Sequence, residues 1–200
     1  MEILFRRADL ATRPAGLLAV GVPQGAPPRG EFASRLEAAG AGALHALLAS
    51  GDFAGRAGES ALLYPKGVKA KRVLVVGLGP AGDLGVRTVL LAAATAARRA
   101  RELGAGTLLL ALSESIESTP GLARAVGEGV VLGHHRHTAY LSAGGKAPLT
   151  SVEVLTLAAP SAAGKSALAA GVARGEAVAM ARDLASTPGQ DLPPAALAAR

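Results

Sequence analysis

Length, composition and charge limit what this chain can be. Its 200 residues are enough for one large domain, or for an ordinary domain with an attached piece. The sequence contains no cysteine, which excludes disulfides and thiolate metal sites. Charged residues interrupt the first few apolar positions, a pattern of neither a signal peptide nor a membrane span, so we expect a cytoplasmic protein with no membrane segment.

Strands and helices are predicted in alternation from the N-terminus onward. Residues 2–5 and 16–22 have the pattern of short strands, and a turn rich in proline and glycine follows at 23–30. Apolar residues at helical spacing then predict one amphipathic helix over residues 31–50, which ends at Gly51.

The middle of the chain continues this alternation. Residues 60–64, 71–76 and 107–112 are predicted strands, of which the second is a continuous apolar run typical of burial on both faces of a sheet. One helix is predicted from a cap at Asp83 to residue 103, and another begins at Thr119. The pattern from residue 59 to 158 predicts an α/β fold with three layers and a mostly parallel central sheet.

A last strand at 152–157 and a long helix at 165–185 complete the series. Gly171 and Gly175 lie four residues apart on this helix and are expected to permit close packing against another helix. Residues 191–195 have the signals of a further helix start, but the sequence ends at Arg200. A helix start with so little chain after it cannot bury an apolar face, so we expect a second domain to be missing.

Two segments resemble phosphate-binding loops. Gly77, Gly79 and Gly82 have the G-x-G-x-x-G spacing between a predicted strand and a predicted helix. Lys165 and Ser166 stand where a relaxed P-loop places its phosphate and magnesium contacts. The alternatives are a tight strand-to-helix turn for the glycines and a capped linker helix for Lys165. A nucleotide or phosphate-ligand module is therefore the second functional hypothesis.

Other candidate sites are less complete. Among the histidines, His134, His135 and His137 follow a predicted helix, but no acidic residue at helical spacing completes a metal-ligand set, so we expect exposed histidines. No nucleophile is paired with a base at a recognised spacing, and we assign no catalytic or metal-binding residue. The net charge of +6 permits nucleic-acid binding, although the basic clusters have almost no aromatic neighbours for base stacking.

The C-terminal part of the sequence resembles the leucyl aminopeptidase (cytosol aminopeptidase) family. The resemblance rests on the helix at 171–184, which ends in Ala-Arg-Asp-Leu, then on Pro188, Leu192 and the segment Pro-Ala-Ala-Leu-Ala at 194–198. The family pattern has two Asn residues in this segment, at the positions of Ser186 and Gln190 in this chain. The strand with Gly77 and the alanine-rich helix after it also resemble the middle of the family's N-terminal domain, which has a macro-like fold.

This resemblance implies a function and a domain division. Residues 1–160 are expected to form the N-terminal macro-like domain, and residues 161–200 the linker helix and the truncated start of a C-terminal catalytic domain. The parent enzyme is expected to be a homohexamer that removes N-terminal amino acids from peptides with two divalent ions, manganese or zinc. The family's metal ligands and catalytic residues have no matching positions here, so the chain alone is expected to be inactive, with no cofactor of its own. Its expected partner is its own catalytic domain.

Overall fold

The computed structural model describes residues 1–25, 30–140 and 147–199. Positions 26–29 of the predicted proline- and glycine-rich turn lie outside these ranges. Within the ranges, no helix combines the length and the apolar character that crossing a bilayer requires. The strands and helices, in chain order, are β1 (Glu2–Arg7), β2 (Leu17–Gln24), α1 (Glu31–Ala39), α2 (Ala43–Ser50), β3 (Ser60–Leu63), β4 (Val73–Pro80), α3 (Val86–Leu103), β5 (Thr107–Ala111), α4 (Pro120–His134), β6 (Ser151–Thr156), α5 (Ala162–Ser186) and α6 (Pro194–Ala198).

A six-stranded, mostly parallel sheet forms the middle of the molecule, in the order β1-β6-β5-β2-β4-β3. All neighbouring strands pair in parallel except β3, which is antiparallel to β4 at one edge. The strand β1 forms the other edge and pairs with β6 over its whole length, so that Glu2 lies opposite Ser151 and Arg7 opposite Thr156. The predicted α/β class and the mostly parallel sheet are confirmed.

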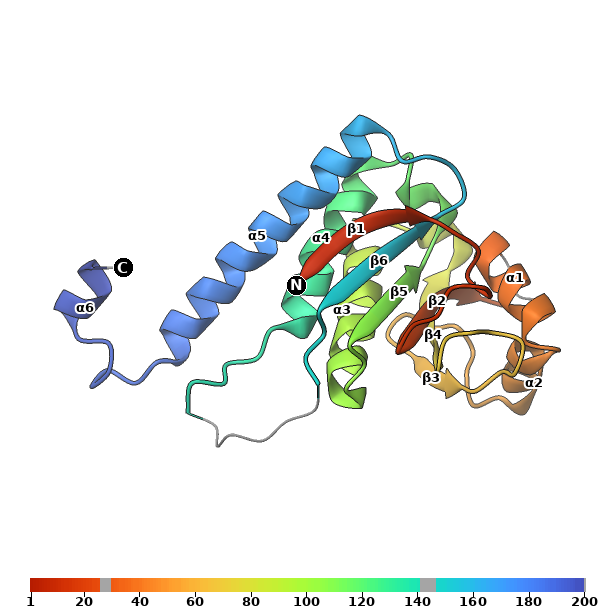
Figure 1. Ribbon diagram of the computed structural model, residues 1–200, viewed down its shortest axis with the longest axis horizontal. Helices are drawn as coiled ribbons and strands as arrows, with labels where there is room; N and C mark the ends of the chain where they lie inside the picture. The colour runs from red at the N-terminus through yellow and green to blue at the C-terminus, as the bar shows by residue number, and fades with distance from the viewer. Residues whose placement is uncertain (26–29, 141–146, 200) are drawn as a thin grey trace.

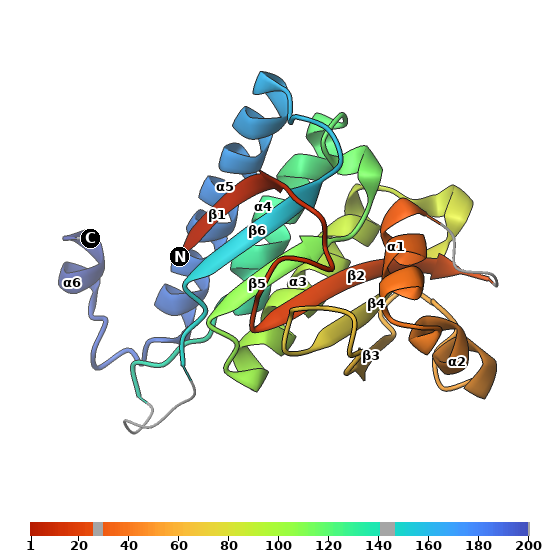
Figure 2. The ribbon, with the colours of Figure 1, turned by 45° about the vertical axis from the view of Figure 1, so that its right-hand side comes forward.

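Helices cover both faces of this sheet, which gives the three predicted layers (Figures 1 and 2). On one face α3 and α4 pack against the sheet, and on the other α1 and α2 do so. The apolar run of β4 explains why both faces are buried, because Leu74 and Val76 belong to the first core while Val73 and Val75 belong to the second.

The long helix α5 lies outside these layers, against α4 (Figure 1). Glycines permit a close approach, because a Cβ on Gly171 would lie 2.0 Å from the carbonyl oxygen of Arg124, and one on Gly127 would lie 2.4 Å from that of Leu168. The predicted packing role of Gly171 is therefore confirmed. Gly175 has the same role, since its Cβ would lie 2.8 Å from Val131.

The single helix expected over residues 31–50 is wrong, because the chain forms two helices there. The helix α1 ends at Ala39, and the backbone turns through Ala41 and Gly42, which have positive φ angles of 50° and 84°. Gly67 packs against the end of α1 at this point, where a Cβ would lie 1.8 Å from the carbonyl oxygen of Ala39. Apolar residues keep helical spacing across the break, so periodicity alone does not reveal it.

Candidate functional site

The glycines of the G-x-G-x-x-G segment do not form the expected strand-to-helix turn. Gly77 and Gly79 lie within β4, which runs to Pro80, and α3 begins only at Val86. Asp83 lies in a 3₁₀ turn before that helix, so the expected cap at Asp83 is wrong. The helix instead follows Gly85, which makes no side-chain cap. No helix N-terminus therefore follows the strand directly, and a phosphate near these glycines would lack this binding group.

Close backbone contact explains Gly77, and a positive φ angle explains Gly79. A Cβ on Gly77 would lie 2.0 Å from the carbonyl oxygen of Arg56, and Gly79 has a φ of +72° that favours glycine. Gly82 has open space around it, with nothing within 4 Å of a Cβ. The segment 55–59 packs along the strand here, since Gly79 donates its N–H to the carbonyl oxygen of Gly55.

Lys165 and Ser166 lie in the first turns of α5 and not in a loop. The helix begins earlier than expected, at Ala162, and its cap is Ser161, whose hydroxyl accepts a hydrogen bond of 3.0 Å from the N–H of Gly164. Both Lys165 and Ser166 are exposed. This geometry is that of the capped-helix alternative. Phosphate binding at either segment stays a prediction, which calorimetry with ATP tests on the wild-type chain and on a Lys165→Ala variant.

The predicted histidines lie at the end of α4, and the structure supplies an acid that the sequence pattern did not. His135 Nε2 and His137 Nδ1 lie 3.3 and 3.0 Å from the same carboxylate oxygen of Asp183 on α5. The histidine side chains are only 14% and 23% exposed, so the expectation of exposed histidines is wrong. Asp183 is 46 residues away from His137 in sequence, which is why helical spacing could not identify it.

Arg101 fixes the end of α4 from the neighbouring helix. Its Nη1 donates to the carbonyl oxygens of His134 and His135, both at 2.7 Å, and so satisfies backbone groups that the helix end leaves without partners. Burial, followed by the charge of Arg101, lowers the pKa of His134. Among the residues that the structure describes, no group of three or more His, Asp or Glu side chains could hold a metal ion.

The carboxyl ends of the parallel strands carry several side chains that bind backbone. In open α/β sheets this edge is where ligands usually bind. Glu114 follows β5, and its carboxylate accepts a 2.9 Å hydrogen bond from the N–H of Phe32 in the first turn of α1. Glu117 lies one turn later and accepts from the N–H groups of Leu157 and Ala158, at 2.9 and 3.1 Å. These two carboxylates hold the loops of the edge together.

A cavity of about 380 Å³ opens at the same edge, where β1 and β6 end. Its lining residues come from the end of β1, from α1 and from the end of β6; they are Arg7, Ala8, Asp9, Arg35, Thr156 and Leu157. We call it the edge cavity. The register explains its position, because Arg7 and Thr156 lie opposite each other as the last residues of the two strands. Sequence patterns identified none of these residues, because they come from three elements, β1, α1 and β6, that are far apart in the sequence.

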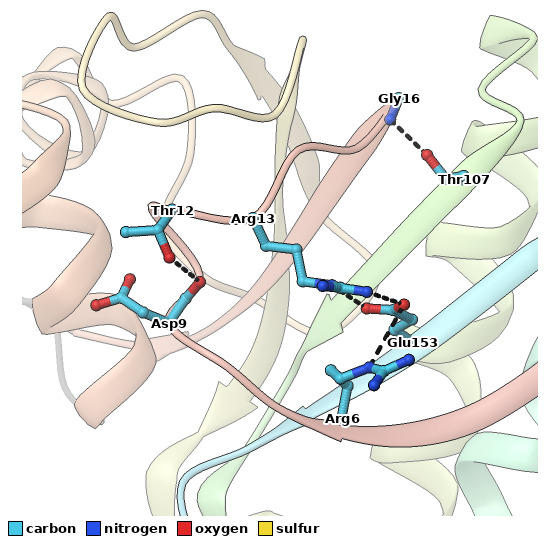
Figure 3. A network of polar contacts seen from close by, with 7 residues as sticks. All are labelled: Arg6, Asp9, Thr12, Arg13, Gly16, Thr107 and Glu153. Carbon is cyan, nitrogen blue, oxygen red and sulfur yellow. Dashed lines mark hydrogen bonds and ion pairs between the residues drawn. The ribbon is translucent and has the colours of Figure 1, made fainter.

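A charged network supports the segment that leads away from the edge cavity (Figure 3). Glu153 on β6 accepts two hydrogen bonds from the guanidinium of Arg13, and its Oε1 lies 3.6 Å from Nε of Arg6. The hydrogen bonds from Arg13 hold the pKa of Glu153 below its usual range. Three residues further along, the N–H of Gly16 donates to the hydroxyl of Thr107 at 2.8 Å. The segment between β1 and β2 is thus fixed to the sheet.

Comparison with known proteins gives consistent results. The family model of the cytosol aminopeptidase family, N-terminal domain, matches residues 19–144. A probable cytosol aminopeptidase from Xanthomonas oryzae pv. oryzae is 40% identical over 167 residues, which cover 83% of this chain and 34% of that protein. Another probable cytosol aminopeptidase, from Roseiflexus castenholzii, is 41% identical over 160 residues, which cover 77% of this chain and 33% of that protein. The chain thus spans about a third of the length of these relatives.

Solved structures agree with the fold. A tomato leucine aminopeptidase mutant aligns with a TM-score of 0.83 over 98% of this chain and 40% of its own, at 24% identity. The bottromycin maturation enzyme BotP aligns with a TM-score of 0.68 over 93% of this chain and 36% of its own, at 34% identity. A second BotP structure, described as a complex with Mn, has a TM-score of 0.67.

Proposed function

Since this chain belongs to the cytosol aminopeptidase family, we propose that it is the N-terminal, non-catalytic part of an exopeptidase that releases N-terminal amino acids from peptides. The observation that carries this proposal is the match of residues 19–144 to the N-terminal domain of the family. The share of about a third that the chain covers in its relatives supports a catalytic part encoded beyond it.

In this proposal residues 1–160 form the N-terminal domain, with a macro-like fold, and residues 161–200 form the linker helix and the start of the catalytic part. The packing of α5 supports this division. Gly171 and Gly175 hold its middle against α4, while the side chain of Met180 further along the helix is exposed. The helix α6 follows and lies apart from the sheet in Figure 1. We expect a catalytic domain to contact the end of α5 and α6.

The proposed parent enzyme works in the cytoplasm as a homohexamer and uses two divalent ions, manganese or zinc. The residues described here do not fit such a metal site, because no group of three or more His, Asp or Glu side chains among them could hold an ion. We therefore place the metal ions in the catalytic part. Manganese is favoured by the second BotP structure, which is a complex with Mn.

The test uses a longer polypeptide that contains this chain. A longer polypeptide that continues this reading frame to the length of the curated relatives is expected to release p-nitroaniline from Leu-p-nitroanilide in the presence of manganese, and to lose activity with a chelator. Size-exclusion chromatography with light scattering measures its assembly, for which we expect six copies. A longer polypeptide that stays folded with bound manganese but cleaves no N-terminal residue would contradict the proposed function.

A further inference from the structure

Positive charge gathers at the amino-terminal edge of the sheet, opposite to the edge cavity. The strands β4, β5 and β6 run in the same direction, so the segments that lead into them meet at this edge. One such segment precedes β4, the end of α3 leads into β5, and the end of α4 leads toward β6. We call the cations that these three places supply the basic edge; they are Lys69, Lys71, Arg72, Arg101 and Arg136.

Two arginines of the basic edge join its parts into one surface. Nη1 of Arg72 donates a 3.2 Å hydrogen bond to the carbonyl oxygen of Leu103, the last residue of α3. Arg101 on the same helix donates to the carbonyl oxygen of His135 at 2.7 Å, and Arg136 is the next residue of the chain. The start of β4 and the ends of α3 and α4 are therefore held side by side.

The two lysines are fixed by their backbone and leave their side chains to solvent. The N–H groups of Lys69 and Lys71 donate to the carbonyl oxygens of Ala11 and Ala15, each at 2.9 Å. Their side chains are exposed, while the residues before and after Lys69 are buried in the core. The fold therefore holds these two ammonium groups at the surface without using their charge.

Opposing charge at the basic edge is small. Lys69, Lys71 and Arg136 form no ion pair with a described residue. The acid nearest in sequence to Arg101 is Glu102, whose carboxylate binds Arg99 at 3.0 Å. Acids and bases are mixed at the carboxyl edge instead, where Glu114 and Glu117 lie. The net charge of +6 is therefore displayed most clearly at the basic edge.

The arrangement of these charges favours an extended partner over a single small anion. The cations are distributed over the ends of three elements, as a row of phosphates requires, and ammonium and guanidinium groups both bind phosphate. Aromatic residues make up 2% of the chain, which leaves no platform for stacking unpaired bases. A duplex, whose bases are already stacked inside, fits this surface better than a single strand does.

We propose that the basic edge binds the phosphate backbone of a nucleic acid duplex without reading its sequence. Lys69, Lys71 and Arg136 contact phosphates, while Arg72 and Arg101 hold the surface together and add their charge to its field. This binding goes beyond the proposed peptidase function and does not depend on it.

Fluorescence anisotropy with a labelled DNA duplex of about 24 base pairs tests the proposal on the 200-residue chain. We expect a dissociation constant of about 10 μM or tighter at about 50 mM KCl. Three phosphate contacts predict that the logarithm of the association constant falls with the logarithm of the salt concentration, with a slope of about −3. A duplex of unrelated sequence is expected to bind within about twofold of the first, because only the backbone is contacted.

Variants locate the binding surface. Lys71→Gln and Arg136→Gln are each expected to weaken binding about tenfold at about 50 mM KCl and to make the salt slope shallower by about 1. The matched control is Arg87→Gln, because Arg87 is exposed in the first turn of α3, at the opposite edge, and its loss changes the net charge equally. We expect this control to bind within about twofold of the wild-type chain.

Three results would overturn the proposal. The first is the absence of binding at about 25 mM KCl with about 100 μM of the folded chain. The second is an equal loss of affinity in Arg87→Gln and Arg136→Gln, since net charge and not the basic edge would then determine binding. The third is tighter binding of poly-L-glutamate, or of vesicles that contain phosphatidylserine, than of the duplex. Peptidase activity of the longer polypeptide is measured separately, so the two proposals fail independently.

Discussion

Glu153 illustrates how a single side chain fixes a loop of this domain. It lies on β6 with only 13% of its side chain exposed, and it holds the segment between β1 and β2 through Arg13 (Figure 3). Because Arg13 is itself about one third exposed, solvent reduces the strength of the pair, and we expect a contribution nearer to that of a charged hydrogen bond than to a buried ion pair.

Replacing Glu153 by Gln is predicted to lower the free energy of unfolding by about 1–2 kcal/mol at pH 7. The pKa of Glu153 is lowered in the folded state, so its stabilisation is present above the unfolded pKa of about 4.3 and is lost as the pH falls through the folded pKa. The stability difference between wild type and the Glu153→Gln variant is therefore expected to shrink below the unfolded pKa and to be lost as the pH falls through the lowered folded pKa. Urea denaturation at pH 7, 5 and 3 measures it.

Glu176→Gln is the matched control, because Glu176 is exposed on α5 and makes no hydrogen bond or ion pair with a described residue. We expect this change to alter the unfolding free energy by less than about 0.5 kcal/mol at every pH. A Glu153→Gln variant that behaves like this control at pH 7 would show that the pair with Arg13 contributes nothing to stability.

The sequence could not predict the polar residues that organise the candidate site. Glu153, Glu117 and Asp183 each act on residues between 40 and 140 positions away, and no local pattern identifies such partners. Gly171 is different, because glycines four apart on a long helix are a local signal of close packing, and the structure confirms it.

At the scale of elements, glycines set the distance between α4 and α5. Replacing Gly171 by Ala puts a methyl group 2.0 Å from the carbonyl oxygen of Arg124, and that backbone atom cannot rotate away. Although alanine is the better helix former, we predict a loss of about 2–3 kcal/mol in unfolding free energy. Chemical denaturation measures the loss.

Gly82→Ala serves as the control for this substitution, since a Cβ there meets nothing within 4 Å. It is expected to change the unfolding free energy by less than about 0.5 kcal/mol. Equal effects of the two substitutions would mean that α5 does not pack on α4 as described.

The second half of α5 is held by the histidines at the end of α4. Because His137 binds Asp183 at 3.0 Å from outside the helix, His137→Ala removes a contact of α5 without changing its helix propensity. We predict amide hydrogen exchange about two- to fivefold faster over residues 176–186, as measured by mass spectrometry. The exposed His45 on α2 supplies the control variant His45→Ala, for which unchanged exchange on α5 is expected.

Sequence patterns predicted the strands more reliably than the connections between elements. Continuous apolar runs such as that of β4 identified the buried strands, because a strand buried on both faces needs apolar side chains at successive positions. The break between α1 and α2 lies beside Gly67, which packs closely on Ala39, and β4 extends through Gly77, which packs closely on Arg56. Such contacts arise only after the chain has folded, so a local pattern does not contain them.

At the scale of the whole molecule, the chain is a three-layer α/β domain with the long helix α5 packed on the outside of α4 (Figures 1 and 2). This domain belongs to the cytosol aminopeptidase family, and the chain spans about a third of the length of the relatives it matches. We propose that residues 1–200 supply a scaffold for an aminopeptidase, and that a separate catalytic part supplies its chemistry.

A turnover assay tests this claim most directly. The purified chain, shown to be folded by circular dichroism, is incubated with Leu-p-nitroanilide and manganese, and the release of p-nitroaniline is followed by absorbance. We predict no release above that of the protein-free solution. Steady turnover that a chelator abolishes and added manganese restores would contradict the claim, because it would place an active metal site within these 200 residues.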